Sequence, residues 1–165
     1  RFNALKQEMM RERAEKKSRH LENAVESLKE LVPFAKKTRV ALAVENRYYY
    51  REIPLIDELT EIFKNFEMGE LFYWHDTGHA EAFERLGFAR HKEFLESFAN
   101  RLLGVHLHDI IGLLNDHRPA GSGTFDFKIL KPYIRPETIK VIEAHPPATA
   151  DEIRKSADYL AKIFE

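Results

Sequence analysis

Residues Leu103–His108 have the sequence LGVHLH and are followed directly by Asp109. Such a short, largely apolar run is typical of a strand that is covered on both faces in a parallel sheet. Runs of the same kind occupy Arg39–Glu45, Leu71–His75 and Ile139–Glu143. We therefore predict four buried strands, each of which closes on polar side chains.

Helical segments separate these strands. Leu21 and Leu28 belong to an apolar stripe with helical spacing ahead of the first strand. Helices are predicted over residues 3–37, from Pro54 to 66, and over 79–86, 91–102 and 151–164, with a capping box at Thr149 and Glu152 and a short helix capped by Asp126. Strands that alternate with helices imply a parallel sheet. The predicted fold class is therefore α/β, with a long helix and four β/α units in a single domain over residues 1–165.

The composition excludes several classes of protein. The 165 residues include 26 Lys and Arg against 27 Asp and Glu, and this balance argues against a nucleic-acid-binding protein. The basic cluster Arg11, Arg13, Lys16, Lys17 and Arg19 alternates with glutamates and is interpreted as a solvated helix face. The absence of cysteine excludes disulfides, thiolate zinc sites and a cysteine nucleophile, and it favours a cytoplasmic location. No apolar run approaches the roughly 20 residues of a membrane span.

Each predicted strand ends at a side chain that can bind a metal: Glu45, Asp76, His108 and Glu143. Active sites of parallel α/β proteins gather at the carboxyl ends of the strands. A mixed set of imidazole and carboxylate ligands suits Mn²⁺, Mg²⁺, Co²⁺ or Zn²⁺. We therefore predict that these four residues form one site for a divalent metal ion.

Several neighbouring residues leave alternatives open. His106 shares a face with His108, and it is either a hydrogen-bonded core histidine or a residue that supports the site or binds a second metal. Asp109–Phe125 is predicted to be a long loop, a class that is often functional. In it, Arg118 is either solvent-exposed or a ligand for a substrate anion, and Gly121–Gly123 forms either a flexible turn or an approach for an anion.

The aromatic residues of the second strand carry a separate expectation. Phe72 and Trp74 are interpreted as contacts to the helices outside the sheet, rather than as a platform for a sugar ring.

Five motifs together resemble the xylose-isomerase-like (β/α) barrel superfamily, of the sugar phosphate isomerase and epimerase type: VALAVEN (40–46), HDTGHA (75–80), GVHLHDIIG (104–112), DHRPAGSGTFDF (116–127) and VIEAHP (141–146). The resemblance covers nearly the whole chain from about Leu21. A complete barrel of this family has eight strands and about 250 residues. The resemblance therefore implies the C-terminal half of a TIM-type barrel, a partial barrel with parallel strands.

The resemblance also implies an activity. Family members hold one divalent ion (Mn, Mg, Co or Zn) with residues at the positions of Glu45, Asp76, His108 and Glu143. In the epimerase branch, the two glutamates also exchange a proton at carbon while the metal polarises the neighbouring oxygens of a sugar, a sugar phosphate or a related polyhydroxy compound. His79 stands where the family has a substrate-contacting histidine, although it could instead make a contact at a helix N-terminus.

A second branch of the same superfamily cleaves DNA at abasic sites with three metal ions and a D-x-H pair. His117 matches the histidine of that pair and is a candidate ligand for an additional metal, but Asn115 occupies the aspartate position. The epimerase branch also tends to have a second glutamate shortly after the first ligand, where this chain has Arg51 and Glu52. The metal ligands are therefore better supported than the substrate pocket.

A third hypothesis is a non-catalytic half-barrel that acts as an assembly module. Four strands leave two open sheet edges and an apolar inner face, and these surfaces require cover. A homodimer with twofold symmetry, or a missing N-terminal half-barrel, would supply that cover. A monodisperse monomer in light scattering, together with the spectrum of a well-folded protein, would contradict the homodimer.

Overall fold

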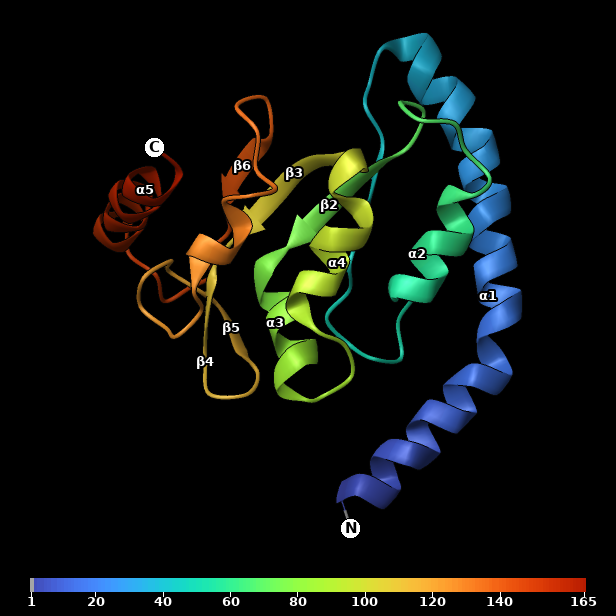
Figure 1. Cartoon of the computed structure of the whole chain (residues 1–165), viewed down its shortest axis with the longest axis horizontal. Helices are drawn as coiled ribbons and strands as arrows, with labels where there is room; N and C mark the ends of the chain where they lie inside the picture. The colour runs from blue at the N-terminus through green and yellow to red at the C-terminus, as the bar shows by residue number, and fades with distance from the viewer. Residues whose placement is uncertain (1) are drawn as a thin grey trace.

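A computed structural model describes residues 2–165 of the protein and shows the predicted parallel sheet (Figure 1). The four strands lie in the order β1–β2–β3–β6, and every neighbouring pair is parallel. Their bounds are Ala43–Glu45 for β1, Phe72–Asp76 for β2, Leu102–Leu107 for β3 and Ile139–Ile142 for β6. The prediction of four β/α units with a parallel sheet is confirmed.

The helices follow the predicted order with small shifts at their ends. They are α1 (Phe2–Thr38), α2 (Ile56–Phe63), α3 (Thr77–Arg85), α4 (His91–Phe98) and α5 (Ala150–Phe164), with 3₁₀ turns at Ala99–Arg101 and Phe127–Leu130. Thr149 and Glu152 form the predicted capping box of α5, and the Asp126 carboxylate accepts a hydrogen bond from the Lys128 amide. None of the helices in the described part of the chain has both the length and the apolar character needed to cross a membrane.

The segment after β3 differs from the prediction of a long loop. It begins with an antiparallel hairpin, in which β4 (Asp109–Ile111) pairs with β5 (Asn115–Arg118). Gly112 has a φ of 63° at the start of the turn, a backbone conformation that glycine adopts without steric cost. The predicted loop was therefore wrong for this part of the segment.

The two faces of the sheet have different surroundings. Tyr73 of β2 packs in a core with residues of α1, α2 and α4, while Val105 and Leu107 of β3 pack with residues of α5. Trp74 points the other way, because it pairs in register with Gly104, and its ring fills the space where a side chain at Gly104 would stand. The interpretation of Phe72 and Trp74 as helix contacts was thus wrong for Trp74, and Tyr73 takes that position.

The face of the sheet opposite the helices is only partly covered. Ile139 and Val141 of β6 lie on it with 47% and 37% of their surfaces exposed. These residues share the face with Gly104 and His106, their partners in register on β3. An open apolar face of this kind is what half of a (β/α) barrel presents where the rest of the barrel would stand.

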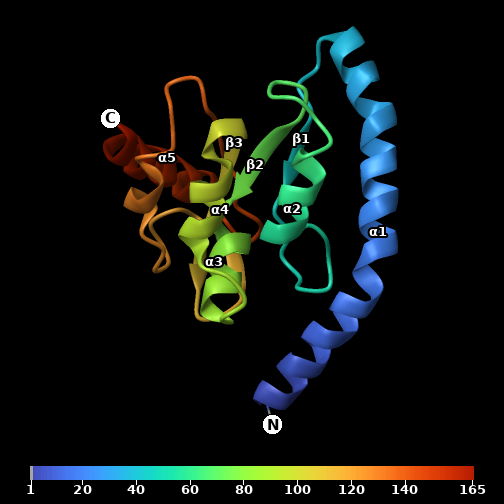
Figure 2. The ribbon, with the colours of Figure 1, turned by 45° about the vertical axis from the view of Figure 1, so that its right-hand side comes forward.

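The first half of α1 extends past the carboxyl ends of the strands (Figure 2). Arg13 anchors it there through hydrogen bonds to both carboxylate oxygens of Glu58, at 2.5 and 2.6 Å, and to the carbonyl oxygens of Tyr50 and Glu52. Arg13 and Glu58 are almost completely buried. The interpretation of the basic cluster as a solvated face is therefore wrong for Arg13, although Arg11 and Arg19 are exposed.

We predict that Arg13→Met destabilises the chain by about 3–5 kcal/mol, because it leaves the Glu58 carboxylate buried without its charge partner. Urea denaturation measures this change in the free energy of unfolding. Arg19→Met is the matched control on the same helix, and we expect it to change stability by less than about 0.5 kcal/mol. Equal effects of the two substitutions would contradict the anchoring role of Arg13.

Candidate metal centre

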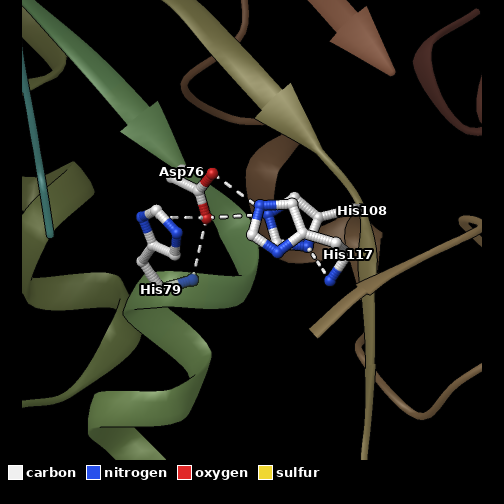
Figure 3. A group of neighbouring side chains, drawn as sticks. All are labelled: Asp76, His79, His108 and His117. Atoms are coloured by element: carbon white, nitrogen blue, oxygen red, sulfur yellow. Dashed lines mark hydrogen bonds and ion pairs between the residues drawn. The ribbon is translucent and has the colours of Figure 1, made fainter. Parts of the chain in front are cut away.

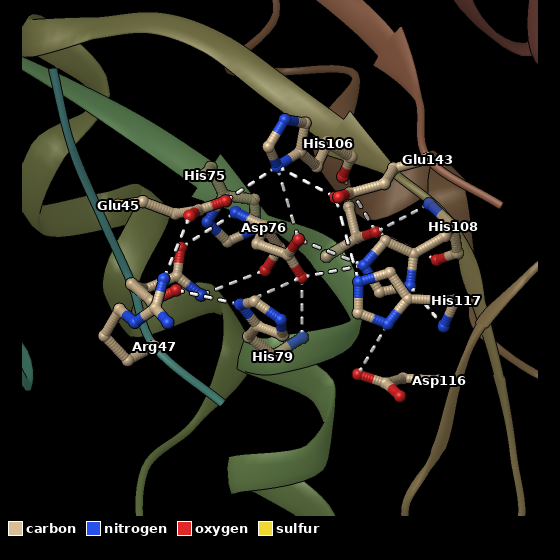
Figure 4. Close-up of polar contacts among 12 residues, drawn as sticks. Glu45, Arg47, His75, Asp76, His79, His106, His108, Asp116, His117 and Glu143 are labelled. Atoms are coloured by element: carbon tan, nitrogen blue, oxygen red, sulfur yellow. Dashed lines mark hydrogen bonds and ion pairs between the residues drawn. The ribbon is translucent and has the colours of Figure 1, made fainter. Parts of the chain in front are cut away.

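The four predicted metal ligands stand at one edge of the sheet. Glu45 and Asp76 are the last residues of β1 and β2, and His108 and Glu143 follow directly after β3 and β6. Figure 4 shows their side chains together with those of several histidines. Parallel strands in register bring their carboxyl ends to the same edge, so residues far apart in the sequence become neighbours.

His106 lies at the centre of the carboxylates. Its Nδ1 atom is 2.6 Å from Oε1 of Glu45, 3.1 Å from Oε2 of Glu143 and 3.5 Å from Oδ2 of Asp76. The ring of His106 is hydrogen-bonded, as in its core-histidine alternative, and it also contacts three of the four predicted ligands.

The charges at this point depend on one another. Burial lowers the pKa of His106, but hydrogen bonds to Asp76 and Glu45 and the charge of Glu143 outweigh it and raise the pKa to about 10. Burial likewise raises the pKa of the Asp76 carboxyl, but hydrogen bonds from His106 and His108 hold it well below its ordinary value. The Asp76 carboxylate and the His106 ring therefore each favour the charged form of the other.

These donors fit a divalent cation. Three carboxylates lie within 3.5 Å of Nδ1 of His106, and the imidazoles of His79 and His108 lie beside Asp76. The Oε2 atom of Glu143 is buried and has no hydrogen-bond partner among the described residues. Hard carboxylate oxygens with one or more imidazoles suit Mg²⁺, Mn²⁺, Co²⁺ and Zn²⁺.

A second group of donors shares Asp76 and consists of Asp76, His79, His108 and His117 (Figure 3). Nε2 of His108 is 2.9 Å from Oδ1 of Asp76. The rings of His108 and His117 stack with centroids 4.1 Å apart, and the backbone amide of His117 donates to Nδ1 of His108 at 2.8 Å. His108 therefore has its proton on Nε2, directed at Asp76.

His79 lies at the N-terminus of α3 and makes a contact there, which is the alternative to substrate binding that the sequence left open. Asp76 caps α3, and its Oδ1 atom accepts a hydrogen bond from the His79 amide at 2.8 Å. The ring of His79 also faces the centre, with Nδ1 3.5 Å from the same oxygen and 3.0 Å from the carbonyl oxygen of Asn46. His79 thus combines a capping contact with a position beside the candidate ligands.

A third donor group joins His117, Glu143 and His145. Nε2 of His117 and Nε2 of His145 lie 3.8 and 3.9 Å from the two oxygens of Glu143, and the two rings stack with centroids 3.8 Å apart. Sequence reasoning did not single out His145. Its place two residues after the strand-end Glu143 is the signal that could have found it.

Arg118 stands apart from these groups. It follows His117 on β5, and no candidate carboxylate ligand within residues 2–165 lies within 4.0 Å of its guanidinium nitrogens. Its buried Nε atom has no hydrogen-bond partner within residues 2–165.

Two residues that the sequence reasoning did not assign hold the centre in place. Asn46 is completely buried, and its side-chain amide accepts from the Asp76 amide and donates to the Asp76 carbonyl oxygen, at 2.8 and 3.0 Å. The Thr77 hydroxyl bonds the backbone of His106 and His108 at the end of β3. Both residues directly follow predicted ligands, which is the signal that the sequence offered.

The Gly121–Gly123 turn does approach an anion, but this anion is the carboxylate of Asp109 in the same chain. The buried Asp109 carboxylate accepts hydrogen bonds from the amides of Gly121 and Phe125, both at 3.0 Å. A Cβ atom at Gly123 would stand 2.3 Å from Oδ1 of Asp109, so glycine is required there for close packing. This turn therefore fixes the hairpin rather than a substrate.

A half-barrel of parallel strands with carboxylates and histidines at their carboxyl ends defines the class of protein. The chain belongs to the xylose isomerase-like TIM barrel family, whose profile matches residues 6–163. It is also similar to a solved structure described as a D-tagatose 3-epimerase-like protein, with 25% identity and a TM-score of 0.69 over 87% of this chain and 54% of that chain. The chain therefore spans about half the length of that structure. No curated protein matches the chain significantly.

These comparisons confirm the resemblance and the partial barrel predicted from the sequence. They support membership of a family of sugar isomerases and epimerases. The metal ligands and the reaction remain proposals.

We predict that Gly78→Ala weakens binding of a divalent ion. A Cβ atom at Gly78 would stand 2.2 Å from Cε1 of His108, so the ring must shift from its position beside Asp76. We expect a loss of about 10–100-fold in metal affinity, the range typical of residues that orient ligands, with the fold retained. Calorimetric titration with Mn²⁺ measures the affinity.

Gly69→Ala is the control for this substitution. Gly69 has a φ of 89° with nothing within 4 Å of the added Cβ, so alanine strains the backbone without touching the centre. We expect it to lower stability by about 1–2 kcal/mol and to leave metal affinity unchanged. Unchanged metal affinity in Gly78→Ala as well would contradict the role of His108.

Proposed function

We propose that this chain forms the metal-binding half of a divalent-metal-dependent isomerase or epimerase that acts on a sugar, a sugar phosphate or a related polyhydroxy compound. The observation that carries the proposal is the convergence of the Glu45, Asp76 and Glu143 carboxylates on one atom, Nδ1 of His106. The similarity to a D-tagatose 3-epimerase-like structure supports this choice of reaction.

In this proposal Glu45, Asp76, His108 and Glu143 hold the metal ion. When bound, the ion would act as a Lewis acid on the carbonyl and hydroxyl oxygens of the substrate. Nε2 of His108 now donates its proton to Asp76, because Nδ1 accepts from the His117 amide. For Nε2 of His108 to become a ligand, this proton would have to move to Nδ1, and the His117 amide would then lose its acceptor.

Glu45 and Glu143 are suited to transfer the proton. They come from β1 and β6, the two edge strands of the sheet, and their carboxylates reach the same ring nitrogen from different sides. A carbon next to a carbonyl that lies between them could lose a proton to one carboxylate and regain it from the other. His79 and Arg118 are the proposed substrate-binding residues, and the buried Arg118 Nε has no partner within residues 2–165.

The additional donor groups favour a second candidate function. Asp76, His79, His108 and His117, together with the His117–Glu143–His145 group, could hold more than one ion, as an abasic-site endonuclease-like phosphodiesterase requires. Asn115, which replaces the expected aspartate in that comparison, is exposed on β5. The number of bound ions therefore separates the two reactions, and a non-catalytic half-barrel would bind none.

We predict that the chain binds one Mn²⁺ ion in calorimetric titration and that Asp76→Asn weakens this binding by more than about 100-fold, since it removes a ligand rather than a supporting residue. With a ketohexose and metal present, we expect exchange of substrate C–H hydrogen with deuterated water. Glu45→Gln and Glu143→Gln should each slow this exchange by about 10²–10⁴-fold, because each removes an acid–base group.

Asp158→Asn provides the control, because Asp158 is an exposed carboxylate on α5. It should leave both ion binding and exchange unchanged. Two or three ions per chain together with cleavage of abasic DNA would favour the endonuclease instead. No ion binding, with Glu45→Gln and Glu143→Gln both thermally silent, would favour the non-catalytic half-barrel.

A further inference from the structure

A hollow of about 620 Å³ lies between the first half of α1 and the loop that follows β1. This volume is within the range of about 300–1,000 Å³ typical of small-molecule sites. Its basic lining residues are Arg13, Lys16, Lys17, His20, Arg47 and Arg51. Only two carboxylates, Glu12 and Glu52, line the same hollow. The whole chain has a net charge of −1, so this excess of positive charge is local.

Two of the basic residues are already neutralised. Arg13 pairs with Glu58 and Lys17 with Asp57, in both cases with a nitrogen–oxygen distance of 2.5 Å. These pairs hold α1 against the loop and the start of α2. They build the wall of the hollow, and the charge available to a ligand must come from the other basic residues.

Arg51 and Lys16 supply that charge. The guanidinium of Arg51 lies over the ring of Tyr49, 4.8 Å from its centroid, and no carboxylate within residues 2–165 lies within 4.0 Å of it. Lys16 reaches only Glu12, at 3.9 Å, and both side chains are largely exposed. A pair at such a distance in water contributes little, so the charge of Lys16 remains available.

Arg47 connects the hollow to the metal centre (Figure 4). It lines the hollow, and its Nη1 atom lies 3.4 Å from Oε2 of Glu45. Its Nε atom lies 3.5 Å from Oε2 of Glu52 on the other side. The basic hollow therefore adjoins the carboxyl end of β1, where the first candidate metal ligand stands.

We propose that this hollow binds the phosphate group of a phosphorylated sugar whose carbonyl end lies at the metal centre. A phosphate monoester carries a charge of about −1.5 to −2 and three acceptor oxygens, and Arg and Lys bind it through charge-assisted hydrogen bonds. An uncharged sugar would leave Arg51 and Lys16 without an opposite charge. Binding of a remote phosphate also helps to hold the reacting carbon in place. The placement of the carbonyl end rests on the proposed function, whereas phosphate binding in the hollow does not.

The arrangement favours a small phosphate ester over a nucleic acid. Lys16 and Arg51 lie in one hollow of small-molecule size, while nucleic-acid-binding proteins present a basic stripe and usually a basic excess. Along α1 outside the hollow, glutamates alternate with the basic residues. A duplex or a single strand would therefore meet repulsion on both sides of the hollow.

The test is calorimetric titration of the metal-free chain with inorganic phosphate, and of the metal-loaded chain with fructose 6-phosphate and with fructose. We expect the double variant Lys16→Gln/Arg51→Gln to weaken binding of both phosphate compounds by about tenfold or more, because it removes two charged hydrogen-bond donors. Neither side chain supports the fold through a buried contact. Arg19→Gln/Lys29→Gln removes the same charge from exposed positions of α1 and should leave binding unchanged.

The outcomes separate this inference from the proposed function. Asp76→Asn should weaken metal binding by more than about 100-fold and leave inorganic phosphate binding intact, which would support the anion site by itself. Equal affinities of fructose and fructose 6-phosphate, or equal phosphate binding in the two double variants, would overturn the inference while the metal centre stands. A single-stranded oligonucleotide that binds the hollow more tightly than fructose 6-phosphate, with a steep salt dependence, would also overturn it.

Discussion

Burial of the Asp76 carboxylate is the constraint on which the rest of this structure depends. An isolated charge in the interior is costly, and it is retained only where partners and hydrogen bonds compensate for the lost water. Asp76 is completely buried, and it obtains these partners from His106, His108 and the amide of His79. The end of β2, the start of α3 and the end of β3 must therefore be positioned together.

The same constraint extends to the loops around the centre. Asn46 fixes the backbone of Asp76, and its side-chain oxygen also accepts from the Tyr73 hydroxyl, which in turn contacts His75 and, through it, His91 of α4. On the other side, the Tyr48 hydroxyl donates to the carbonyl oxygen of Leu114 in the turn of the hairpin, at 2.6 Å. The candidate site is thus held by a network of buried polar contacts, in which the loss of one member affects several others.

The features that depend on local sequence patterns, namely the strands, the helices and their caps, were predictable from the sequence. Apolar runs of strand length between helical stripes were enough for a parallel sheet, and the capping box of Thr149 and Glu152 marked the start of α5. The face that Trp74 occupies was not predictable from β2 alone, because alternation separates two faces without telling which one meets the helices. Gly104 on the neighbouring strand makes the room for the indole ring, and this pairing is a long-range contact.

The hairpin and the candidate metal centre also depend on long-range contacts, which local sequence patterns do not predict. Asn115–Arg118 is polar at every position, so it carries no period-two signal, and the hairpin is held by Asp109 through the distant amides of Gly121 and Phe125. His106 and His108 were correctly placed on one face, but register decides their roles. His106 pairs directly with Asp76, and this brings its ring between the carboxylates of β1 and β6.

The exposure of the four proposed ligands links the centre to the open face of the sheet. Asp76 and His108 on the central strands are fully buried, whereas 24% of the Glu45 side chain and 32% of the Glu143 side chain remain exposed on the edge strands. Electrostatic interactions strengthen as water is removed. Asp76 and His108 are therefore already shielded from water, which strengthens their interaction with a cation. The Glu45 and Glu143 carboxylates would be shielded to the same degree only if other strands covered the inner face of the sheet. Because Glu45 and Glu143 are proposed both as ligands and as the proton-transfer pair, metal binding and catalysis would both depend on cover from strands beyond the four of this sheet.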